Sequence, residues 1–580
     1  MKKEYIKGKD EALDVTIEKM NTLLKSHGFD IEEKSWLNPV EGIHSLHIQE
    51  SGCELLFTNG KGATPQACLA SALGEFFERL GCGYLFADYW FGEDISGQPF
   101  VHHPDERWFS PEDGERPVGL LSESLWRFYD PHSELAAWEL FDINTGIIER
   151  GVCALPFSSQ RDGEKIYFPV NILENLYVSN GMAAGNTPEE ARVQALSEIL
   201  ERHVKEKVIK EALSLPEIPK DLIAGYPHIA ASIEAIEAAG LKLKICDASL
   251  GGRYPVVNVT MIDPDRGACL ASFGAHPLFE VALERSVTEL LQGRTTKRRE
   301  DFKTPVFEEA KYASDENIVE HFIDSTGVLS CDYFRSDTDF AFAFRDFDGD
   351  TKEQFEYLVS SIESEGYDIY IADYNHLGID VCRILVPGMS EIYPVSDLVW
   401  SNNNEGARYR PYILTLEKMQ KDEWLAILEN LKEDEIDDSR NVAEFIGMAP
   451  DTESAWRHLQ IGTLKTMLAL AAEELDAAKD GIRWMLHFGN LTDEQKKLYR
   501  CIETLLQIEE DAGKERKRYE KGVRMLYGDE TYDLANAIVD AKIRFYGLHF
   551  SESLDEVFKL HGRLLENLQK SRVAMQKACR

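Results

Sequence analysis

Residues 187–203 read TPEEARVQALSEILERH and predict one helix with polar and acidic side chains along a single face. Thr187 suits the N-cap and Pro188 suits the first helical position. Glu190, three residues after the threonine, would complete a capping box. Side chains three or four residues apart lie on the same side of a helix, which places four of them together. They are Glu190, Gln194, Glu198 and Glu201.

An earlier stretch, residues 64–79, repeats the pattern as TPQACLASALGEFFER. Two capped helices that both end in E-x-x-E-R indicate an internal duplication with a site between the copies. A third helix, expected over residues 277–292, would place Arg285, Glu289 and Gln292 on one face. When residues 64–79 are aligned with residues 187–202, so that Arg79 matches Arg202, the other identical positions are Thr64/Thr187, Pro65/Pro188, Ala72/Ala195, Leu73/Leu196, Glu75/Glu198 and Glu78/Glu201.

The acidic faces call for a compensating cation. Carboxylates that share one helix face repel, and partial burial among apolar neighbours increases the cost. Carboxylate oxygens suit Mg²⁺, which usually binds together with phosphates. An arginine can donate two parallel hydrogen bonds to phosphate oxygens, and the candidates are Arg79, Arg202 and Arg285. This inventory is typical of a phosphoryl-transfer site. The alternative left open is a solvated face with ion pairs inside each helix.

Three motifs together resemble the YcaO domain. They are S-x-x-x-E-x-x-E-R at 71–79, Q-x-x-x-E-x-x-E-R at 194–202 and E-R-x-x-x-E-x-x-Q at 284–292. GKD at 8–10, SNGMAAGNT at 179–187 and SFGAHP at 272–277 add to the resemblance, which runs over about residues 1–400 and into the tail. No Walker A loop and no G-x-G-x-x-G after a strand occurs, so a nucleotide site would need another design.

The resemblance implies ATP and Mg²⁺ as cofactors and assigns residues to each. The implied Mg²⁺ ligands are Glu75, Glu198, Glu201 and Glu289. The implied ATP contacts are Lys9, Thr16, Ser71, Glu78, Asn186, Glu190, Gln194, Arg202 and Arg285. Glu190 has a competing interpretation, since it could serve only as the capping-box partner of Thr187. No catalytic residue is identified.

The family chemistry implied by the resemblance is ATP hydrolysis with phosphoryl transfer to an amide oxygen. Azoline-forming members commonly end in a Pro-rich tail, whereas this chain ends SRVAMQKACR. Stand-alone bacterial members imply a different function, accessory to β-methylthiolation of an aspartate on a small-subunit ribosomal protein by a radical methylthiotransferase. Two alternatives remain: an ATP-dependent cyclodehydratase acting on a peptide, and a non-catalytic helical scaffold.

Composition limits the class of binding partner and the cellular compartment that we expect for this protein. The chain has 63 Lys and Arg against 102 Asp and Glu, a formal net charge of -39, which argues against nucleic acid and suits a basic ribosomal protein. Ten cysteines without a C-x-x-C indicate a reducing compartment. No apolar signal region and no run of 18 apolar residues occurs, so a cytoplasmic protein without membrane contact is expected.

We expect an α+β fold with two parts. A YcaO-type body of duplicated helices on sheets would cover residues 1–404, and an all-α, tetratricopeptide-like domain would cover residues 405–580 and support a homodimer. The body is expected to begin with a helix over 9–28. Strands are expected at 44–49, 53–58, 165–178, 242–249, 254–264, 268–274, 368–375 and 381–388.

Overall fold

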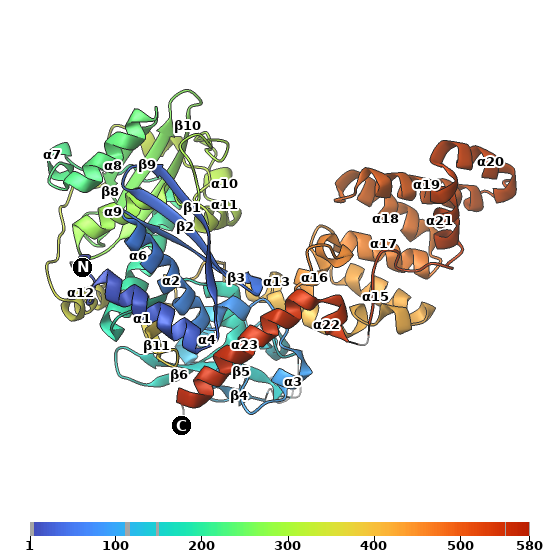
Figure 1. The fold of residues 1–580 in the computed structure, drawn as a ribbon, viewed down its shortest axis with the longest axis horizontal. Coiled ribbons are helices and arrows are strands. Elements are labelled where there is room, and N and C mark those ends of the chain that lie inside the picture. The colour runs from blue at the N-terminus through green and yellow to red at the C-terminus, as the bar shows by residue number, and fades with distance from the viewer. Residues whose placement is uncertain (1–4, 111–115, 147–149, 552, 579–580) are drawn as a thin grey trace.

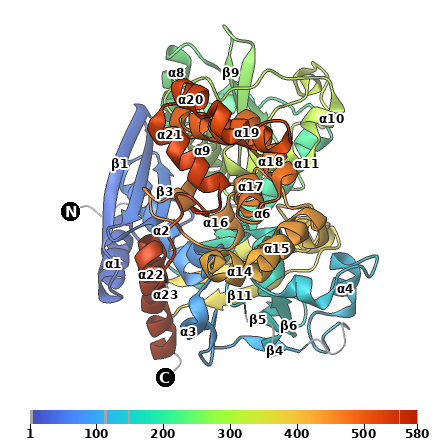
Figure 2. The same ribbon diagram turned by 90° about the vertical axis from the view of Figure 1, so that its right-hand side faces the viewer.

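The computed structural model describes residues 5–110, 116–146, 150–551 and 553–578. A body of sheets and helices carries a group of helices that projects to one side, shown in orange in Figure 1. The last helix, α23 (Lys559–Ala578), returns from that group and lies beside the first sheet of the body, as the views of Figures 1 and 2 agree. The α+β fold class is confirmed.

The first sheet is a three-stranded antiparallel meander of β1 (Ile31–Val40), β2 (Ile43–Glu50) and β3 (Cys53–Gly62). Helices α1 (Leu13–Ser26) and α2 (Pro65–Gly81) pack together, and α2 also covers β2 and β3. The helix predicted over 9–28 is therefore shorter, and Lys9 precedes it. Strand β1 was not predicted because it is a mostly exposed edge strand, interrupted by bulges and Pro39, without a clean alternation.

The second sheet contains β8 (Lys242–Asp247), β9 (Val256–Asp263) and β10 (Ala268–Ala275), where strands were predicted. Helices α8 (Pro227–Ala238) and α9 (Phe279–Glu289) cover it. The third motif helix thus ends at Glu289 rather than at 292. Gln292 lies in the turn that follows, where its amide donates to the Asn59 carbonyl at 3.2 Å.

The third sheet joins distant parts of the chain. Its order is β4 (Arg107–Phe109), β5 (Val152–Ser159), β11 (Tyr370–Tyr374), β12 (Asp380–Leu385) and β7 (Met182–Gly185), with β6 (Lys165–Pro169) beside β5. The strand predicted over 165–178 is correct only as far as Pro169, because residues 170–177 form helical turns. Helix α6 (Pro188–Lys210) packs on β7, β12 and β10, and α12 (Thr351–Ser364) packs on α6.

The projecting part is helical, as predicted. It contains the helices α17 (Ile461–Ala471) and α18 (Leu475–Phe488), which contact each other. They are flanked by α15 (Lys421–Glu433), α19 (Asp493–Glu510), α20 (Arg516–Tyr527) and α21 (Asp529–Val539). The other helices are α3 (Gly92–Ser96), α4 (Glu123–Tyr129), α5 (Val170–Ile172), α7 (Lys220–Ile223), α10 (Glu309–Tyr312), α11 (Asp315–Ile323), α13 (Asp397–Trp400), α14 (Arg410–Ile413), α16 (Val442–Phe445) and α22 (Leu554–Val557).

Candidate functional site

The helices α2, α6 and α9 line one cavity of about 600 Å³ in the body, which lies within the usual size of ligand pockets. The segment before α1 and residues 322–325 complete its wall. Every residue that the sequence assigned to ATP or to Mg²⁺ lines this cavity. These residues are Lys9, Thr16, Ser71, Glu75, Glu78, Asn186, Glu190, Gln194, Glu198, Glu201, Arg202, Arg285 and Glu289.

The same local design starts α2 and α6. The hydroxyl oxygens of Thr64 and Thr187 each accept a hydrogen bond at 3.1 Å from the backbone three residues on, and proline follows. Two residues before each threonine is a glycine where the strand meets the helix. A Cβ on Gly62 would lie 2.7 Å from the Cys68 nitrogen, and one on Gly185 would lie 2.5 Å from the Ala191 nitrogen. These equivalent close approaches support the internal duplication.

Each of the four carboxylates assigned to Mg²⁺ faces a basic side chain. Glu75 pairs with Arg79 at 2.6 Å, and Glu198 lies 3.9 Å from Arg202. The two remaining contacts are Glu201 with Arg285 at 3.9 Å and Glu289 with Lys61. Among the described residues no group of three or more acidic, His or Cys side chains is already arranged around a metal position. Mg²⁺ commonly takes one or two carboxylates plus phosphate oxygens, so this set suits a metal that arrives with a nucleotide.

Burial shifts the pKa values of three acids in the cavity upward. Burial raises the pKa of Glu75 and of Glu198 despite the arginine beside each. The pKa of Glu78 lies well above its usual value because of burial first and then the charges of Glu198 and Glu75. Burial also lowers the pKa of Lys61 to about 8. A divalent cation would reduce the repulsion among these carboxylates and favour their ionised form.

The contacts of Glu190 argue against its interpretation as a capping-box residue. Thr187 accepts from the Glu190 backbone, but no reciprocal bond from the glutamate side chain to the Thr187 backbone forms, so the capping box is only half made. The 3% exposed carboxylate instead accepts from the Asp10 backbone at 2.9 Å and from the Asn186 amide at 3.0 Å, and it pairs with Lys9 at 3.2 Å. Burial acts to raise the Glu190 pKa, but Lys9 and these donors outweigh it and the pKa is lowered.

Further contacts tie the polar lining together. The Thr16 hydroxyl donates to Asn186 Oδ1 at 2.9 Å, and Arg285 donates to Gln194 Oε1 at 2.7 Å. Ser71 Oγ accepts from the Lys61 backbone at 3.4 Å. The Nε atoms of Arg79 and Arg202 are buried and have no hydrogen-bond partner among the described residues. Unused buried donors in a cavity lined by many cations suit an anion such as a phosphate chain.

The sequence assignment missed several basic side chains of the same cavity, among them Lys61, Lys205 and Arg294. Lys205 was detectable, because it follows Glu201 by four residues and extends the acidic face of α6. Lys61 directly follows Asn59-Gly60 at the end of β3, and no periodicity marks it. Arg294 lies in the turn after α9, where helical spacing no longer applies.

Lys205 should make the stability of the protein depend on pH. Burial first, and Arg202 next, lower its pKa from 10.5 to about 7. Below pH 7 both folded and unfolded states are protonated and the full penalty applies. As pH rises from 7 toward 10.5 only the unfolded state keeps the proton, so the free energy of unfolding should increase by about 1 kcal/mol per pH unit. The free energy of unfolding, measured with urea between pH 7 and 8.5, should rise less steeply with pH in Lys205→Met than in the unmodified protein. An equal rise in both proteins would contradict the lowered pKa of Lys205.

Comparison with known proteins identifies the family. Residues 59–390 match the domain described as "YcaO cyclodehydratase, ATP- and Mg²⁺-binding", and residues 406–577 match "YcaO cyclodehydratase C-terminal domain". The chain belongs to the YcaO family. The predicted family is thus confirmed, and the family description includes the predicted cofactors ATP and Mg²⁺.

Two relatives match over almost their whole length. The chain is 46% identical to the ribosomal protein S12 methylthiotransferase accessory factor YcaO of Escherichia coli, covering 99% of both chains. It is 44% identical to an uncharacterized protein of Haemophilus influenzae, covering 97% of both. The solved structure of YcaO from Methanopyrus kandleri bound with AMPPCP and Mg²⁺ aligns with a TM-score of 0.40 and 17% identity, over 69% of this chain and 97% of that one. Within the described residues, no helix has the length and apolar character needed to cross a membrane.

Proposed function

We propose that this protein binds and hydrolyses ATP with Mg²⁺ in the cavity between α2, α6 and α9, as an accessory factor in β-methylthiolation of an aspartate on a small-subunit ribosomal protein. The observation that carries the nucleotide site is the convergence of all the assigned residues on one cavity. The name of the Escherichia coli relative supports the ribosomal role, with a radical methylthiotransferase as the second partner. The net charge of -39 suits a basic ribosomal protein.

In this proposal the carboxylates Glu75, Glu198, Glu201 and Glu289 hold Mg²⁺, which would neutralise charge on the phosphates. Arg202 and Arg285 donate to phosphate oxygens, and Lys9 with Glu190 fixes the segment before α1 against the nucleotide. The remaining ATP contacts are Thr16, Ser71, Glu78, Asn186 and Gln194. The acids that the arginines now face would turn to the metal, which frees guanidinium groups for phosphate.

The organisation is proposed as a YcaO body over 1–404 and a helical domain over 405–580. The gap between the two family matches, which end at 390 and begin again at 406, supports this division in sequence. A cytoplasmic location, a homodimer and a tetratricopeptide-like character of the helical domain belong to the same proposal. The ribosomal role named for the Escherichia coli relative supports the cytoplasmic location, and the packed helix pairs α17–α18 and α19–α21 support the tetratricopeptide-like character.

A cyclodehydratase acting on a peptide is the second candidate, favoured by the description of the matching family. Incubation with ATP, Mg²⁺ and candidate peptides distinguishes the two. Loss of one water from a peptide, measured by mass spectrometry, would favour this candidate. ATP consumption without loss of peptide mass would favour the accessory role.

Calorimetric titration tests the nucleotide site directly. ATP should bind with measurable heat when Mg²⁺ is present, and at least about tenfold more weakly when EDTA removes the metal, because crowded carboxylates then face the phosphates uncompensated. The absence of heat in Mg²⁺ would leave only the non-catalytic scaffold alternative.

A further inference from the structure

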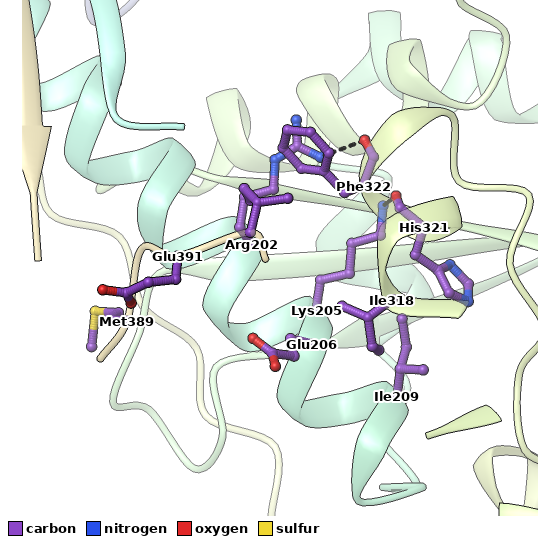
Figure 3. Close-up of a pocket in the computed structure, with 10 residues that line it drawn as sticks. Arg202, Lys205, Glu206, Ile209, Ile318, His321, Phe322, Met389 and Glu391 are labelled. Carbon is purple, nitrogen blue, oxygen red and sulfur yellow. Dashed lines mark hydrogen bonds between the residues drawn. The ribbon is translucent and has the colours of Figure 1, made fainter. Parts of the chain in front are cut away.

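The C-terminal end of α11 (Asp315–Ile323) closes one wall of the cavity. Residues 321–325, here the latch, include Phe322, Ile323, Asp324 and Ser325 of the cavity lining. Phe322 also lines a small neighbouring pocket, together with Met389 and Glu391 (Figure 3). Phe322, Arg202 and Lys205 therefore line both hollows, of which the neighbouring one is small, about 20 Å³.

Three cations hold the latch by its oxygen atoms. Arg202 donates to the Phe322 carbonyl at 3.1 Å, and Lys205 donates to the His321 carbonyl, as Figure 3 shows. Lys205 also donates to Ser325 Oγ at 3.0 Å, and Arg294 donates to the Asp324 carbonyl. Carbonyls at a helix C-terminus lack intrahelical donors and carry partial negative charge, so cations are suitable caps.

The latch itself carries unfavourable features that these cations offset. Ser325 has φ +64, a left-handed conformation that non-glycine residues rarely adopt. The turn is tight, because a Cβ on Gly327 would lie 2.2 Å from the His321 ring. His321 Nδ1 is buried with no hydrogen-bond partner in the described part of the chain. A strained segment persists only while its surroundings hold it.

Arg202 links the latch to the nucleotide. Its guanidinium lies 4.5 Å from the Phe322 ring and donates to a neutral carbonyl, while its buried Nε is unused. It is also an assigned phosphate ligand. A hydrogen bond to a charged phosphate oxygen is roughly twice as strong as one to a neutral carbonyl. Arg202 should therefore bind a phosphate oxygen in preference to the Phe322 carbonyl.

We propose that the latch is closed in the free protein and is released when phosphates draw Arg202 away from the Phe322 carbonyl. Release opens the cavity wall at residues 322–325, so the second reactant gains access beside the phosphates only after the nucleotide has bound. This inference rests on the proposed nucleotide site and adds an order of binding to it.

Hydrogen exchange of the full chain, followed by mass spectrometry, tests the latch. With saturating AMPPCP and Mg²⁺, amides of residues 322–328 should exchange about tenfold faster than in the free protein, because one of the three side chains that anchor the latch is lost. Calorimetry on the same sample reports binding independently. Binding without faster exchange would overturn the latch and leave the nucleotide site standing; no binding would overturn both.

A variant tests the anchors without nucleotide. Lys205→Met should raise exchange of residues 322–328 about tenfold in the free protein, since two bonds to the latch disappear. Lys207→Met is the matched control, because Lys207 lies on the same helix and pairs with Glu211 at 3.7 Å, outside the cavity. Equal exchange of residues 322–328 in the two variants would contradict the role of Lys205 in holding the latch.

Discussion

Replacing Glu198 by alanine should weaken Mg²⁺-dependent ATP binding by about a hundredfold while the protein stays folded. Glu198 lies in the middle of the acidic face of α6, in the same cavity as Glu75 and Glu201. Its loss removes a proposed metal ligand and leaves Arg202 without the carboxylate that it pairs with. Burial raises the Glu198 pKa, so the ionised carboxylate opposes folding and its removal should not lower the free energy of unfolding.

Calorimetry with ATP and Mg²⁺ measures this effect, and chemical denaturation checks the fold. Glu189→Ala is the matched control, because Glu189 lies on the first turn of the same helix but outside the cavity lining. It should bind ATP as tightly as the unmodified protein. Unaltered affinity in a folded Glu198→Ala variant would reject the role of this side chain in holding the metal.

Replacing Arg572 by methionine should lower the free energy of unfolding of the body by about 3 kcal/mol. Arg572 on α23 is fully buried and donates to the Val101 carbonyl, to the Phe100 carbonyl at 2.7 Å and to Gln98 Oε1 at 2.7 Å. The same helix places Leu564 and Leu568 in the hydrophobic core around α2 and the first sheet. Methionine fills the space but leaves these acceptors without donors.

Denaturant unfolding measures this loss. Arg563→Met changes an exposed arginine of the same helix and should alter the free energy of unfolding by less than about 0.5 kcal/mol. A stability equal to that of this control would mean that α23 does not hold the body together, and that the residues of the tail act as an independent unit.

The sequence located the cavity well because its signal is local. Capped helices with acids at helical spacing predict which side chains share a face, and the repeat predicts that two such faces meet. The equivalent glycines, Gly62 and Gly185, are a further local signal of the duplication. They lie two residues before the helix caps in both copies and allow close contact between strand and helix.

Contacts between segments that are distant in the sequence could not be predicted from such local patterns. The pattern of α23 marks a helix but does not say that it returns to the first sheet. Strand β1 lacks alternation because most of its side chains are exposed. The latch depends on Lys205 meeting a segment about 120 residues further along the chain. Glu190 looked like a capping residue because its spacing from Thr187 is right, yet Lys9 and the Asp10 backbone bind its carboxylate.

The most direct test of the central claim is a crystal structure of this protein with AMPPCP and Mg²⁺. The phosphates should lie in the cavity between α2 and α6, with Mg²⁺ bound by carboxylates among Glu75, Glu198, Glu201 and Glu289 and with Arg202 turned from the Phe322 carbonyl to a phosphate oxygen. A nucleotide bound elsewhere, with these carboxylates still paired to Arg79, Arg202, Arg285 and Lys61, would contradict it.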